Sequence, residues 1–144
     1  MLATLRQFLH EGSPWRSLRG NPTLIVDSCS VRAKRGGALT GPHPTDRAKM
    51  GTKYHLAVDG DGTPLACVAT AANVNDTLVF ERLFLAAFAV VARIRAGFVD
   101  KGCDAEHHRT LCRTFGVDPF IHKRGLAHGS GLGKQRWPVE RSLS

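Results

Sequence analysis

Three acidic residues are placed so that a fold could gather them around a divalent metal ion. Asp27 follows the apolar run at residues 23–26 and Asp100 follows the apolar run at 97–99, so each is predicted to end a buried strand. Glu140 follows Trp137-Pro138, a pair typical of the first turn of a helix. Converging carboxylates repel each other unless a cation neutralises them, and their hard oxygen atoms suit Mg²⁺.

This set of acids indicates phosphodiester chemistry. Mg²⁺ also binds water and phosphate oxygens, and two such ions about 4 Å apart can stabilise both the attacking and the leaving oxygen. Each acid has a structural alternative. Asp27 and Asp100 could cap turns. Glu140 could be a solvated residue in the first turn of a helix, where its negative charge interacts favourably with the helix dipole. Asp104 competes with Asp100 as a carboxylate, but its place predicts a helix cap.

The charge balance favours a nucleic-acid partner. The 144 residues carry 20 Lys and Arg against 12 Asp and Glu, a net charge of +8, which suits a polyanion. The longest apolar run, residues 83–92, is too short to span a bilayer, and residue Arg6 interrupts the N-terminus before any signal-peptide core forms. We therefore expect a one-domain cytoplasmic, nucleoid-associated protein with no membrane partner.

The other polar clusters are predicted to have structural roles and no catalytic one. The four cysteines lack C-x-x-C spacing, and Cys103 and Cys112 with the histidines between them lack the second ligand pair of a zinc site, so reduced thiols are expected. Asp59 and Asp61 hold only a fragment of a calcium-loop pattern and predict a hairpin turn. The segment Asn73 to Thr77 predicts a helix cap.

The order of predicted elements indicates an α/β domain with a mixed sheet flanked by helices. Residues 32–53 are rich in cations, Gly and Pro, and predict a mobile surface loop. The other predicted elements are a helix at 3–10, strands at 24–26, 54–58, 65–71, 98–99 and 117–121, helices at 78–95 and 105–115, and a helix opening at 137–138.

Basic residues in Gly-rich, exposed segments are the expected contacts to DNA phosphates. They lie in the cationic segment 32–53 or after residue 121, where the four glycines of 125–134 indicate flexibility. The predicted DNA-binding set is Arg32, Lys34, Arg35, Lys49, Lys53, Lys123, Arg124, Lys134, Arg136 and Arg141.

Four segments carry a resemblance to a known family. They are DSCSVRAKRGG at 27–37, KYHLAVD at 53–59, DKGCD at 100–104 and RWPVER at 136–141. Together with the element order, they resemble the catalytic domain of bacterial insertion-sequence DDE transposases over about residues 22–144. The resemblance implies an RNase H-like fold, with residues 1–21 as a short N-terminal helical remnant.

The resemblance also implies a function. Asp27, Asp100 and Glu140 would be both catalytic residues and metal ligands, holding Mg²⁺ or Mn²⁺ as two ions. The expected activity is DNA strand cleavage and strand transfer, on the ends of an insertion sequence and on target DNA. A homo-oligomer in a transposition complex would be expected as well.

Several positions depart from the family pattern. Cys103 replaces the usual aromatic residue, Gly133 stands where a Tyr is common, and a Lys expected after Glu140 would fall beyond Ser144. Pro14-Trp15-Arg16 resembles a family segment that normally lies farther from the first Asp. These departures predict a shortened copy whose C-terminal helix is truncated. The alternative function is an inactive fragment that retains a DNA-binding or assembly role.

Overall fold

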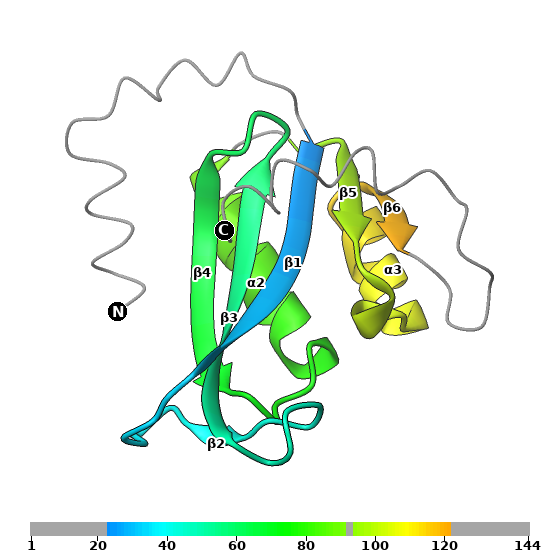
Figure 1. Cartoon of the computed structure of the whole chain (residues 1–144). Helices are drawn as coiled ribbons and strands as arrows, with labels where there is room; N and C mark the ends of the chain where they lie inside the picture. The colour runs from blue at the N-terminus through cyan, green and yellow to red at the C-terminus, as the bar shows by residue number, and fades with distance from the viewer. Residues whose placement is uncertain (1–22, 92–93, 122–144) are drawn as a thin grey trace.

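A single mixed sheet forms the frame of the molecule (Figure 1). The computed structural model describes residues 23–91 and 94–121. Strand β1 pairs antiparallel with β3, which also pairs with β2 and β4, whereas β1, β5 and β6 run parallel. The strands are β1 (Thr23–Arg32), β2 (Gly41–Pro42), β3 (Met50–Asp59), β4 (Pro64–Ala71), β5 (Ala96–Val99) and β6 (Asp118–Ile121). The expected mixed sheet is confirmed.

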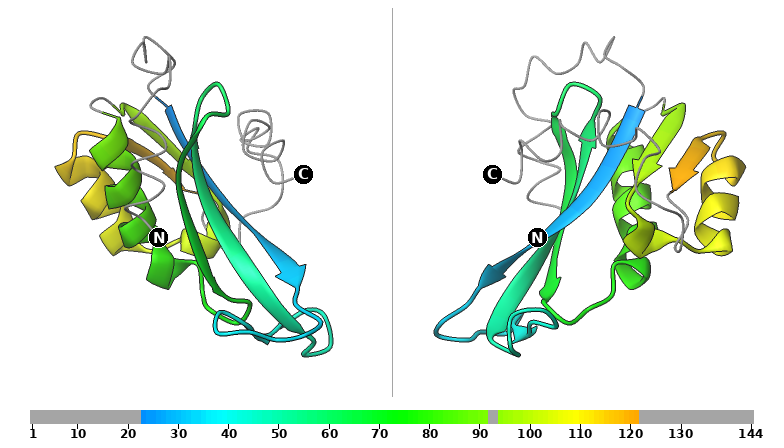
Figure 2. Two further views of the ribbon diagram at one scale, coloured as in Figure 1. Left: turned by 90° about the vertical axis from the view of Figure 1, so that its left-hand side faces the viewer. Right: turned by 45° about the vertical axis from the view of Figure 1, so that its right-hand side comes forward.

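Two helices cover one face of this sheet and make its main core (Figure 2). They are α2 (Thr77–Val90) and α3 (Glu106–Thr114), and each connects strands that end up parallel. Helix α2 buries Phe80, Leu83 and Phe84 at helical spacing, and each such side chain contributes about 1.5–3 kcal/mol. Because side chains alternate along a strand, Leu24 and Val26 join this core while Ile25 lies on the opposite face.

Strand β1 is longer than predicted. It was expected to end at Asp27, but it continues to Arg32 and pairs with β3 throughout, from Leu24 opposite Asp59 to Arg32 opposite Gly51. Pairing with β5 stops earlier, at Val26 opposite Val99. The antiparallel ladder with β3 satisfies the backbone beyond Asp27, and such a ladder tolerates polar residues on a solvated face.

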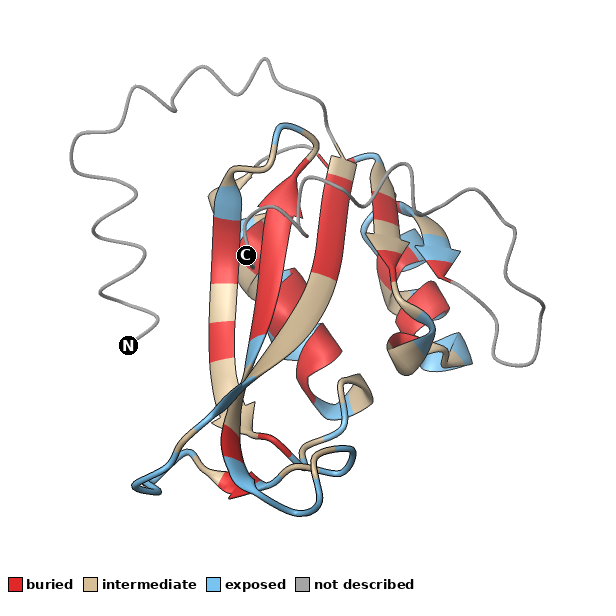
Figure 3. Cartoon of the chain, in the orientation of Figure 1, coloured by how far each residue is buried: buried red, intermediate tan, exposed pale blue. Residues whose placement is uncertain are grey.

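The cationic segment 32–53 was predicted to be one loop, and this prediction is wrong. Its first residue closes β1, its middle forms β2 and its last residues, 50–53, open β3. We call residues 32–51 the arm. It carries most of the exposed surface at the far end of the β1–β3 pair (Figure 3).

The remaining elements agree with the predictions except in detail. The β3–β4 hairpin is confirmed, and Asp59 Oδ1 accepts the backbone N–H groups of Asp61 and Thr63 at 2.9 and 2.8 Å. Helix α2 ends at Val90 instead of residue 95. The N-cap position of α3 is held by Ala105 and not by Asp104. The Asp104 carboxylate accepts a 2.7 Å bond from Arg109, which also reaches the Ile121 carbonyl.

Several predicted features lie outside the described residues. They are the 3–10 helix, the helix carrying Glu140, and the cations Lys123, Arg124, Lys134, Arg136 and Arg141. Within the described ranges, no helix is long and apolar enough to cross a membrane.

The arm contains two consecutive non-glycine residues in the left-handed region. Arg47 and Ala48 have φ values of 51° and 56°, in a turn that a 2.8 Å bond from the His43 N–H to the Lys49 carbonyl closes. For an alanine this conformation costs roughly 1–2 kcal/mol. Ala48→Gly should therefore raise the free energy of unfolding by about 0.5–1 kcal/mol in urea titrations, after glycine's own entropy cost. The control, Ala38→Gly at an exposed arm position without positive φ, should lower the free energy of unfolding. A lower free energy of unfolding in both variants would contradict backbone strain at Ala48.

Candidate functional site

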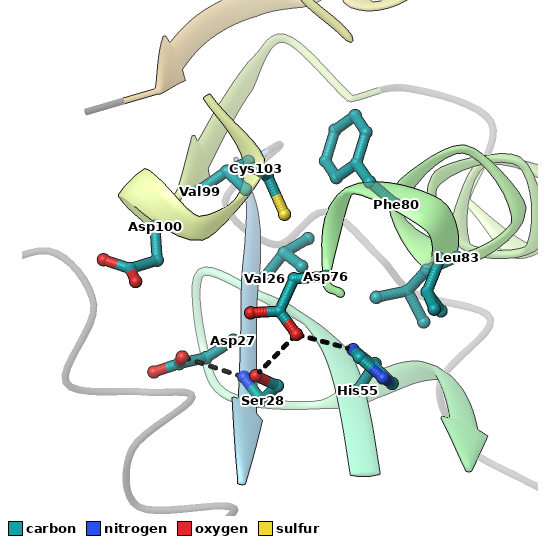
Figure 4. Close-up of a pocket in the computed structure, with 11 residues that line it drawn as sticks. Val26, Asp27, Ser28, His55, Asp76, Phe80, Leu83, Val99, Asp100 and Cys103 are labelled. Carbon is teal, nitrogen blue, oxygen red and sulfur yellow. Dashed lines mark hydrogen bonds and ion pairs between the residues drawn. The ribbon is translucent and has the colours of Figure 1, made fainter. Parts of the chain in front are cut away.

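The pairing register of β1 and β5 places Asp27 and Asp100 next to each other. Val26 lies opposite Val99, the last pair of this parallel ladder, and each acid is the next residue along its strand direction. Both are half-buried and line one pocket, and their carboxylates point to the same side in Figure 4. The other lining residues are Val26, Ser28, His55, Asp76, Val79, Phe80, Leu83, Val99 and Cys103.

Local backbone structure orients each acid. The Ser28 N–H donates a 2.8 Å bond to Asp27 Oδ1, which fixes this carboxylate beside its own strand. Asp100 precedes the short 3₁₀ turn η2 (Lys101–Cys103) and its carbonyl accepts from the Cys103 N–H at 3.0 Å. The turn makes no side-chain cap bond with Asp100. Asp100 lines the pocket, and its carboxylate points to the same side as that of Asp27 in Figure 4.

Asp76 is the site residue that the sequence did not reveal. It was predicted to cap α2, and it occupies the N-cap position, but it makes no side-chain cap bond. Its Oδ1 instead accepts from Ser28 Oγ at 3.2 Å and from Lys53 Nζ at 3.3 Å, and lies 3.4 Å from His55 Nδ1 (Figure 4). The sequence signal was only its place before a helix that must pack across β1 and β3.

Comparison with known proteins assigns this chain to a family. The family model described as "Transposase DDE domain" matches residues 18–144. The chain belongs to the insertion-sequence DDE transposases. It is 42% identical over 147 residues to a Burkholderia cepacia protein named "Putative transposase for insertion sequence element IS402", covering 97% of this chain and 67% of that protein.

Solved structures confirm that the fold of this DDE domain is RNase H-like. A chain of the piggyBac transposase synaptic complex with hairpin DNA superposes with a TM-score of 0.54 at 15% identity, covering 88% of this chain and 31% of that one. A chain of the Mos1 mariner paired end complex with Mn gives 0.54 at 11% identity, covering 99% and 46%. The DDE domain thus spans less than half of either solved chain.

The donor chemistry of the pocket fits a divalent ion in part. Asp27 and Asp100 offer hard oxygen ligands, and Mg²⁺ completes its octahedron with water and phosphate oxygens. Among residues 23–91 and 94–121, no three His, Cys, Asp or Glu side chains are grouped to hold a metal ion. The third acid predicted from the sequence, Glu140, lies outside these ranges.

The cysteines of the DDE domain are free thiols. Burial, and then the charge of Asp27, raises the pKa of Cys29, while burial raises the pKa of Cys112 to about 11. His108, one of the histidines between Cys103 and Cys112, is buried. Its ring nitrogens lie 2.9 Å from the Cys103 carbonyl oxygen and 3.1 Å from that of Thr77.

The predicted DNA-binding cations of the arm and β3 differ in their surroundings. Lys34, Arg35 and Lys49 are exposed, whereas Lys53 points inward, with only 17% of its side chain exposed and a 2.9 Å bond to the Val74 carbonyl. Arg32 forms a two-pronged pair with Asp46, in which Arg32 Nη2 donates to Asp46 Oδ1 at 2.8 Å. This guanidinium lowers the pKa of the Asp46 carboxyl.

The buried His55 makes stability depend on pH. Burial, the largest effect, and Lys53 lower its pKa below 6.5, although Asp76 opposes them. When pH falls through this range, the unfolded chain takes up the proton first, so the free energy of unfolding should fall with pH. His55→Gln should remove this part of the slope in urea titrations at several pH values, and His107→Gln, at an exposed position on α3, should keep it. Equal slopes in both variants would contradict the assignment.

Proposed function

We propose that this DDE domain catalyses DNA strand cleavage and strand transfer for an insertion sequence, with Asp27, Asp100 and Glu140 as the catalytic metal ligands. The observation that carries the proposal is the register of β1 and β5, which places Asp27 and Asp100 together at the rim of one pocket. Family membership supports the reaction class.

The residues would divide the chemistry as follows. Asp27 and Asp100 would bind the ions, and the bond from the Ser28 N–H holds the Asp27 carboxylate in place. Two bound Mg²⁺ or Mn²⁺ ions would activate water or a DNA 3′-hydroxyl and stabilise the departing oxygen. The protein's own part is to hold DNA and ligands in line, which needs no covalent nucleophile on the enzyme.

DNA and further copies of the chain are the proposed partners. The exposed arm cations Lys34, Arg35 and Lys49 suit the phosphates of insertion-sequence ends and target DNA. Solved chains of the same fold come from a synaptic complex with hairpin DNA and from a paired end complex, which supports a homo-oligomer that acts on DNA.

Loss of either described acid should abolish strand cleavage. We expect the DDE domain to nick supercoiled plasmid only with Mg²⁺ or Mn²⁺, and Asp27→Asn or Asp100→Asn to lower the rate by roughly 100-fold or more, because even supporting residues of metal sites cost 10- to 100-fold. Asp61→Asn, in the β3–β4 turn, changes the same charge away from the pocket and should nick normally.

The same assay separates the proposal from the alternative. Nicking that persists in Asp27→Asn would place the chemistry elsewhere. DNA binding without nicking by the parent chain would favour the inactive, DNA-binding role instead.

Contacts of the arm with phosphates should appear in the salt dependence of DNA binding. Each lost phosphate contact reduces the slope of log K against log salt by about 0.9. Replacing both Lys34 and Arg35 by Ala should therefore flatten the slope by about 2 units in a binding titration at several salt concentrations.

The matched control replaces Arg82 and Arg113 by Ala, since both are exposed and lie on the helical face of the sheet. This variant has the same net charge and should keep the parent slope. An equal change in both variants would show that total charge matters and that the arm makes no localised contact.

A further inference from the structure

One carboxylate touches the chain segments of both proposed metal ligands. Asp76 Oδ1 accepts from the hydroxyl of Ser28, the residue after Asp27, at 3.2 Å. Its Oδ2 packs against Gly102, two residues after Asp100: a Cβ placed on Gly102 would lie 2.8 Å from this oxygen. Asp76 therefore lies between β1 and the η2 turn, which deliver the two acids.

The partners of Asp76 argue against a role as metal ligand. The Lys53 ammonium lies 3.3 Å from Oδ1, only 17% of its side chain is exposed, and a second bond ties it to the Val74 carbonyl. A carboxylate paired with a half-buried ammonium already has its charge balanced, and that ammonium would repel a divalent ion. Asp76 also belongs to no three-residue metal-binding group within the described ranges.

The same oxygen fixes β3 against β1. His55 lies opposite Ser28 in the ladder and Lys53 lies opposite Ser30, so Asp76 spans both strands. Asp76 lies beside His55 Nδ1, and His55 Nε2 lies 2.9 Å from the Thr70 hydroxyl oxygen. Ser28, Lys53 and His55 would each lose a partner if the carboxylate moved.

We propose that Asp76 is a positioning residue: by holding Ser28, Lys53 and His55 on one side and abutting Gly102 on the other, it sets the spacing of Asp27 and Asp100. It binds neither ion nor DNA. This proposal rests on the proposed strand-cleavage function, because the spacing matters to metal ions that the two acids share. A positioning residue of a metal site affects metal affinity by about 10- to 100-fold.

A double-mutant cycle with Gly102 tests the contact directly. Gly102 lacks a positive φ, so alanine fits its backbone, but the new Cβ must displace Asp76 Oδ2. In the full chain, Gly102→Ala should raise the half-saturating Mn²⁺ concentration for nicking by about 10-fold, and Asp76→Ala by at least as much. In the Asp76→Ala background, Gly102→Ala should add less than about twofold, because the two changes break one contact.

Additive effects in this cycle would overturn the proposal. Direct Mn²⁺ titration by electron paramagnetic resonance gives the second criterion: Asp76→Asn should bind the parent number of ions with weaker affinity. A lost ion would make Asp76 a ligand and overturn the positioning role. Unchanged affinity, at a temperature where the variant is folded, would overturn it as well.

Hydrogen exchange without metal separates failure of this proposal from failure of the proposed function. Asp76→Asn should speed amide exchange in segments 27–29 and 100–104 together, while Asp61→Asn should change neither segment. If the parent chain neither binds Mn²⁺ nor nicks DNA, the strand-cleavage function fails, and the exchange result still decides whether Asp76 couples the two segments. Unchanged exchange in both segments would overturn the coupling.

Discussion

The parallel pairing of β1 with β5 is the constraint on which the site depends. Neighbouring strands lie about 4.8 Å apart, so the register that aligns Val26 with Val99 brings the next two residues, both aspartates, into repulsive range. Burial of Val26, Val99 and their neighbours under α2 holds the acids there. A divalent ion bound by both carboxylates would neutralise their repulsion.

The sequence predicted well what depends on local patterns. Apolar runs located the cores of β1 and β5, the Asp-Gly-Asp-Gly turn located the β3–β4 hairpin, and helical spacing located α2. Asp27 and Asp100 were therefore expected to come together around a metal ion. Local patterns failed where long-range pairing decides the outcome. The strand was predicted to end at Asp27, yet β3 supplies a ladder for residues 28–32, so β1 runs past its predicted end.

The role of Asp76 shows the same limit for the site. An Asp before a helix has a good local use as a cap, and nothing nearby in sequence indicates otherwise. Its real partners, Ser28, Lys53 and His55, are 48, 23 and 21 positions away and meet it only through the folding of α2 over the sheet. His108 likewise looks like a surface residue until α3 packs against α2 and buries it between the carbonyl groups of Cys103 and Thr77.

The fold thus separates two tasks along β1. Its first half is buried, paired on both edges and rigidly placed, which suits a residue that must hold a ligand position. Its second half loses the β5 partner and leads into the cationic arm, whose exposed side chains suit an extended polyanion. Asp27 stands at the boundary, where a site of fixed geometry meets the surface available to DNA.

The central claim is that Asp27 and Asp100 share metal ions, and anomalous diffraction from crystals soaked in Mn²⁺ tests it most directly. The account predicts Mn²⁺ peaks within about 2.5 Å of carboxylate oxygens of both residues, with a pair of ions about 4 Å apart when both positions fill. Peaks only at other carboxylates, such as the Asp59–Asp61 turn, with none between Asp27 and Asp100, would contradict it.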